Sequence, residues 1–162
     1  MTSYEQVNDM FFALIERDWE FFNYYDIPED EAIALAEKRA RQLMEEAVRL
    51  IDTKCLPQID FSQRNEEDTG FAFDLTTREE YLIPMVMLFI YLRRDIAKLK
   101  MYEVNFTASE IKVFDPSNAR DSFLRMYTAV KDEVDQLLDD YKNTDRETGR
   151  YLMFDPSKYD VE

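Results

Sequence analysis

Apolar residues recur at spacings of three and four along four stretches of the chain, a period that predicts amphipathic helices. These stretches cover about residues 3–24, 28–55, 77–100 and 116–142. Each is long enough to form several helical turns, and the chain has too few glycines for a turn-rich β fold. The pattern therefore predicts an all-α fold, a bundle-like domain of four to five helices.

The third stretch contains "LIPMVMLFIYL" at residues 82–92, an uncharged run in a highly charged chain. A bilayer span needs about 20 apolar residues, so this run is too short for one. A helix that is apolar on nearly every side belongs in the centre of a core. Thr76 or Thr77, each with a glutamate three residues later, forms a capping box at its start. We expect residues 77–100 to be the central helix.

Two segments between the helices lack a helical period. Residues 58–75 contain Gly70 and three phenylalanines and are expected to form a long loop whose aromatic side chains are buried against the domain. Residues 101–115 alternate apolar and polar positions around Ala108 and Ser109, which predicts either a small β-hairpin or an extended loop.

The C-terminal tail follows the last helix. We expect a single helical domain over residues 1–143 and a C-terminal arm over 144–162, in which residues 144–149 are a polar, flexible spacer. Beyond the spacer the tail is rich in aromatic and aliphatic residues of the kind that anchor protein interfaces. The predicted partner-binding residues are Tyr151, Leu152, Met153, Phe154 and Tyr159. The alternative is that the tail folds back over its own helices.

Charge limits the partners. The chain has 20 basic and 35 acidic residues, a formal net charge of −15, which disfavours tight binding to DNA or to anionic membranes. The most basic stretch lies in the second helix, where Arg39 and Arg41 are candidates for contact with the acidic surface of a neighbouring subunit. Alternatively, these arginines pair locally with Glu45, Glu46 and nearby acidic surface.

The residues of common catalytic chemistry are scarce. There is no histidine, and one cysteine, Cys55, excludes an internal disulfide and fits a reducing compartment. The glycines, Gly70 and Gly149, are too few for a phosphate-binding loop. Residues 143–149 resemble a calcium loop only faintly, because the glycine is one position late and the closing acid is missing. We expect no catalytic, cofactor or metal site, and no enzyme.

Residues 74–96 and 112–141 resemble the small helical head–tail connector proteins, also called adaptor or head completion proteins, of tailed bacteriophages. In the resemblance, an Asp-Leu-Thr start with an acid three residues later opens a hydrophobic helix that carries an aromatic-Leu pair. A loop then closes on a phenylalanine before a long acidic helix. The matching residues are Asp74, Leu75, Thr76, Glu79, Tyr91, Leu92, Phe114, Ser117, Asn118, Asp140 and Tyr141.

The resemblance implies a structural subunit that forms a ring, usually of twelve copies, beneath the portal protein. Such a ring extends the DNA channel, which DNA crosses without specific binding, and offers a platform for a stopper or tail-completion protein. It implies a place in the neck of the virion and, during assembly, in the host cytoplasm. Pro84 inside the central helix and the long aromatic tail depart from the family pattern.

Two other functions remain open from the sequence. An acidic helical inhibitor that mimics DNA and blocks a host enzyme would share the small size and negative charge, although the basic second helix interrupts an evenly acidic face. A plain interaction module of a bacterial host is the third alternative.

Overall fold

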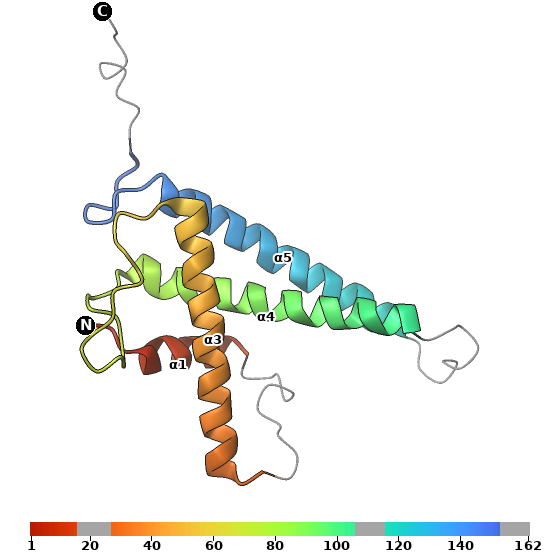
Figure 1. Ribbon diagram of the computed structural model, residues 1–162. Helices are drawn as coiled ribbons and strands as arrows, with labels where there is room; N and C mark the ends of the chain where they lie inside the picture. The colour runs from red at the N-terminus through yellow and green to blue at the C-terminus, as the bar shows by residue number, and fades with distance from the viewer. Residues whose placement is uncertain (16–26, 106–115, 153–162) are drawn as a thin grey trace, which may run out of the picture.

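The computed structural model describes residues 1–15, 27–105 and 116–152. Four helices make up this part: α1 (Tyr4–Leu14), α3 (Glu29–Cys55), α4 (Thr77–Asn105) and α5 (Pro116–Lys142) (Figure 1). The same residues form no β-strand, only isolated antiparallel β-bridges. The predicted all-α class is confirmed.

Helix α1 begins with a capping box in which Ser3 and Gln6 satisfy each other's backbone N–H groups. It ends at Leu14, short of the predicted end at residue 24. The N–H of Ile15 is shared between the carbonyls of Phe11 and Phe12, a tightening typical of a last helical turn. Residues 16–26 lie outside the described part.

Helix α3 agrees with its prediction to within one residue, because prolines mark both ends. Pro28 is the N-cap, and Leu56, one residue before Pro57, adopts the left-handed conformation that ends many helices. Helix α5 has the bounds predicted for it.

Helix α4 begins with the expected capping box. The Glu79 N–H donates to Thr76 Oγ1 (3.4 Å), and the Thr76 N–H donates to Glu79 Oε2 (2.8 Å). The helix continues to Asn105, beyond the predicted end at residue 100. Residues 101–105 are therefore helical, and the predicted hairpin or loop is wrong for them; residues 106–115 lie outside the described part.

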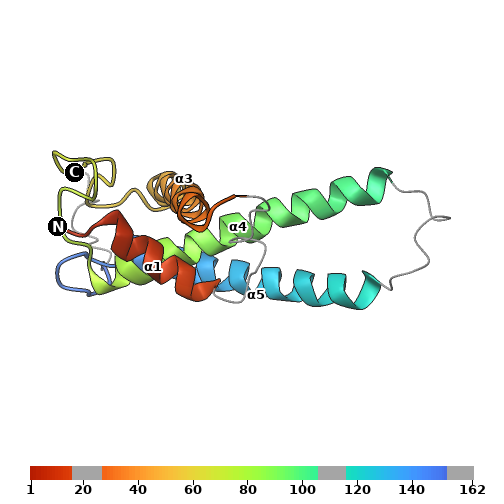
Figure 2. The same ribbon diagram turned by 90° about the horizontal axis from the view of Figure 1, so that it is seen from below.

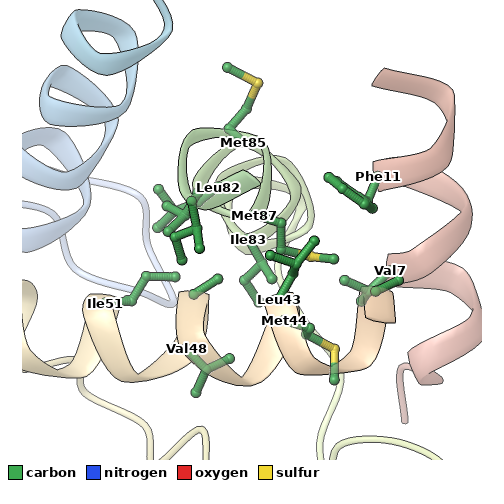
Figure 3. Packing of buried hydrophobic residues seen from close by; sticks show 14 of the residues in the cluster. Val7, Phe11, Leu43, Met44, Val48, Ile51, Leu82, Ile83, Met85 and Met87 are labelled. Atoms are coloured by element: carbon green, nitrogen blue, oxygen red, sulfur yellow. The ribbon is translucent and has the colours of Figure 1, made fainter. Parts of the chain in front are cut away.

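The core forms around α4, as the apolar run predicted. Helices α1 and α5 lie along opposite sides of α4, and α3 crosses it steeply (Figures 1 and 2). Figure 3 shows side chains from α1 and α3 converging on Ile83 and Met87 of α4, both fully buried. Burying apolar side chains from three neighbours on one helix supplies the main stabilisation of the fold.

The loop between α3 and α4 closes one end of this core. Phe61 and Phe71 are fully buried and Phe73 packs beside them, which confirms the prediction for the loop. The loop also pairs with the N-terminal residues: the Phe71 N–H donates to Thr2 O (3.0 Å). At Gly70 a Cβ atom would lie 2.6 Å from that same oxygen, so only glycine allows the backbones to approach this closely.

Two helical arms extend beyond the core. The N-terminal part of α3 projects to one side, and the far ends of α4 and α5 project together to another (Figures 1 and 2). No side chain from Asp121 to Glu133 is buried, and between Asp30 and Arg39 only Ala36 is. These arms expose the apolar side chains of Ile33, Leu35, Leu124 and Met126.

Candidate docking surface at the C-terminal loop

Residues 143–152, here called the C-terminal loop, form a closed turn rather than a flexible spacer. The Leu152 N–H donates to Asn143 O (2.7 Å), and the Asp145 N–H donates to Arg150 O (2.8 Å). These two hydrogen bonds join the two ends of the loop and close the turn. Asp145 Oδ1 also accepts from the Thr148 N–H and hydroxyl. Gly149 takes the positive φ of 67° that the turn needs. The predicted spacer is thus wrong for residues 144–149.

Arg146 fastens the loop to the domain. Its guanidinium donates to both oxygens of Glu79, Nε to Oε1 (2.8 Å) and Nη2 to Oε2 (3.0 Å), and Nη2 also donates to Asp74 O (2.8 Å). The Arg146 N–H donates to Gln58 Oε1 (3.0 Å). The boundary placed at residue 143 therefore does not separate an arm from the domain, because residues 144–152 pack on it. Residues 153–162 lie outside the described part.

Glu79 is fully buried, and both oxygens of its carboxylate accept hydrogen bonds. Besides Arg146 and the Thr76 N–H, it accepts from the Tyr141 hydroxyl (2.7 Å). Burial, followed by this hydrogen bond, raises the pKa of the Tyr141 hydroxyl above its ordinary value of 10.0. One buried carboxylate thus connects the start of α4, the end of α5 and the C-terminal loop.

The loop displays two of the five predicted partner-binding residues. Tyr151 and Leu152 are 68% and 54% exposed, which is high for such side chains on an ordered loop. Met153, Phe154 and Tyr159 lie outside the described part, and their role in partner binding stays a prediction. Tyr81 of α4, 51% exposed, was not predicted from the sequence.

Beside these residues lies a partly enclosed pocket of about 300 Å³, here called the tyrosine pocket. It is formed by the first turns of α4, the last turns of α5 and the C-terminal loop. Its lining residues are Thr77, Arg78, Tyr81, Leu82, Leu137, Asp140, Tyr141, Thr144 and Tyr151.

The two arginines predicted to contact a neighbouring subunit have partners within the chain. Arg41 Nη2 lies 2.6 Å from Asp68 Oδ2, Arg41 Nε lies 3.8 Å from Glu45, and the guanidinium lies over the Tyr4 ring. Arg39 lies over the Tyr91 ring at 5.3 Å. These are contacts of the local kind that the alternative interpretation expected, and contact with another subunit stays a prediction.

Among the described residues, no group of His, Cys, Asp and Glu side chains could hold a metal ion. Cys55 is buried, and burial raises the pKa of its thiol to about 11, so little reactive thiolate forms near neutral pH. No helix in the described ranges combines the length and apolarity needed to cross a bilayer.

Comparison with known proteins adds no relative: no protein-family model, curated protein or solved structure matches the chain.

Proposed function

We propose that the protein is a structural, non-enzymatic subunit of a phage neck, which docks as a ring beneath the portal and extends the DNA channel. In this role it would be a virion protein and would present a platform for a stopper or tail-completion protein. The proposal rests on the resemblance of residues 74–96 and 112–141 to head–tail connector proteins, together with the form of the subunit.

The observation that carries it is that the helices are much longer than the core they share. Helix α3 runs for about two turns before Ala36 is buried, and no side chain of α5 between Asp121 and Glu133 is fully buried. These arms expose apolar side chains such as Ile33 and Met126. Phe123, Tyr127 and Val130 give the α5 arm partial burial against the core. The apolar side chains that stay exposed on both arms would be buried in a subunit that packs against copies of itself.

The charge of α5 supports a place beside DNA in transit. Asp132, Asp135 and Asp139 are exposed and spaced three and four residues apart, so they share one face of the helix. Such a face turned to the channel would repel phosphates and keep DNA from adhering to the wall.

Binding to purified portal rings tests the proposal. Portal rings of the phage that encodes the chain are mixed with the protein at low and high salt and examined by electron microscopy and native mass spectrometry. We expect an added ring with a defined copy number that persists at high salt. Salt-sensitive competition with DNA for a host enzyme, without portal binding, would support the inhibitor alternative instead.

A further inference from the structure

The tyrosine pocket has an unusual arrangement of hydroxyl groups. Three of its lining residues are tyrosines, and each donates its hydroxyl to a different carboxylate. Tyr81 donates to Glu133 Oε1 (2.8 Å), Tyr141 to Glu79 Oε1 (2.7 Å) and Tyr151 to Asp140 Oδ1 (3.3 Å). A phenol that donates to an anion is polarised toward its ring, which makes the ring face more negative.

Negative ring faces bind cations. A guanidinium or ammonium group over a tyrosine ring is attracted by the ring's quadrupole, and a carboxylate at the edge adds direct charge attraction. This chain already uses the interaction internally, since the guanidinium of Arg41 lies 4.8 Å from the centroid of Tyr4. Among the described residues, no cation of the chain lies over Tyr81, Tyr141 or Tyr151.

One cation, Arg78, does line the pocket. Its Nη2 donates to the carbonyl of Gly149 (3.1 Å), so this guanidinium holds the C-terminal loop. Asp140, which lines the pocket, and Glu133, which accepts from the Tyr81 hydroxyl, are both exposed. Their two negative charges outnumber the single positive charge of Arg78. The surroundings therefore remain favourable for a second cation.

We propose that the tyrosine pocket binds an arginine side chain presented by a partner protein. Arginine suits it because the planar guanidinium stacks on aromatic rings and forms paired hydrogen bonds with a carboxylate such as Asp140. A pocket of about 300 Å³ has room for one such side chain. Exposed Tyr151 and Leu152 at its rim would contact the residues next to that arginine.

This inference rests on the proposed docking function for the statement that the partner is a protein of the neck. It deepens that function by naming the chemistry of the contact, a basic segment on the partner against a preformed aromatic and acidic pocket. A preformed pocket also avoids the ordering cost that a flexible arm would add on binding.

Nuclear magnetic resonance titration of the intact protein tests it. The probe is N-acetyl-arginine methylamide, and the control probe is N-acetyl-citrulline methylamide, which has nearly the same shape without the charge. We expect the arginine probe to shift the ring resonances of Tyr81, Tyr141 and Tyr151 in a saturable manner, and the citrulline probe to leave them unchanged.

Two variants locate the binding. Asp140→Asn removes the carboxylate charge and Tyr81→Leu removes one ring; both residues are exposed, so the fold should survive. Each substitution should lower the affinity for the arginine probe by about two- to fivefold. Glu147→Gln, a matched change on the same loop but outside the pocket lining, should bind as the wild type does.

Equal shifts from the citrulline probe, or wild-type affinity in both Asp140→Asn and Tyr81→Leu, would overturn the inference. The titration contains no phage component. Its failure would therefore reject the pocket and leave the neck function standing, whereas failure to bind portal rings would reject the neck function alone.

Discussion

Replacing Arg146 with alanine should destabilise the whole domain, although Arg146 lies in what looks like a polar tail. The side chain of Glu79 is 0% exposed and that of Arg146 is 20% exposed, so the substitution leaves a buried carboxylate without its cation. Breaking a buried ion pair in this way costs about 3–5 kcal/mol. The Tyr141 hydroxyl and the Thr76 N–H still donate to Glu79, which favours the lower end, about 3 kcal/mol.

The measurement is thermal and urea unfolding followed by circular dichroism. For a chain of 162 residues, a loss of about 3 kcal/mol lowers the Tm by about 6–12 °C. Arg150→Ala is the matched control, because Arg150 is exposed on the same loop; it should change the free energy of unfolding by less than about 0.5 kcal/mol. Adding Glu79→Gln to Arg146→Ala should recover part of the loss by removing the buried charge.

If Arg146→Ala and Arg150→Ala unfold at the same temperature, the C-terminal loop is not fastened through Glu79, and the account of the loop is wrong.

Three further predictions concern the core, the contact between Gly70 and the N-terminal residues, and the loss of stability at high pH. Met87→Asp places a charge at a fully buried position and should cost about 4 kcal/mol or more, whereas Met87→Leu should cost less than about 1.5 kcal/mol; urea unfolding compares them. Gly70→Ala should cost about 1–3 kcal/mol in the same assay, because the new methyl group meets backbone. The raised pKa of Tyr141 contributes stability that is complete below pH 10.0 and is lost as the pH rises above it. As the pH rises from about 9 to above 10.0, the Tyr141→Phe variant should therefore lose less free energy of unfolding than the wild type. Equal losses in the two proteins would contradict a raised pKa of Tyr141.

The sequence predicted those parts of the fold that local signals determine. Helices α3 and α5 were placed well because Pro28, Pro57 and Pro116 mark their ends. The central position of α4 followed from its uniform apolarity. The end of α1 was missed because the apolar spacing continues past Leu14 without a glycine or proline to stop the pattern.

The candidate site was only partly predictable. Tyr151 and Leu152 were expected to be available to a partner, and the structure does expose them. The contact between Glu79 and Arg146 joins positions 67 residues apart, and no local pattern reports such a pairing. Glu79 was recognised only as a capping residue. A signal for the loop was nonetheless present, since Asp145 followed by Thr148 and Gly149 is typical of a turn.

The same contact changes how the C-terminal tail should be tested. A chain truncated after Asn143 would lose Arg146 together with the tail, so a loss of assembly could reflect a damaged fold. A chain truncated after Leu152 keeps the Arg146 contact and the tyrosine pocket and removes only residues 153–162. The two truncations therefore separate stability from docking.

The central claim is that the protein joins a phage neck at the portal, and the most direct measurement is its incorporation into portal-containing particles. Particles assembled without the protein are supplied with the full chain or with the chain truncated after Leu152, and the neck is imaged by electron cryomicroscopy. The account predicts a ring beneath the portal with the full chain. With the truncated chain it predicts a weakened or absent ring at an unchanged Tm. A folded full chain that adds no density beneath the portal would contradict it.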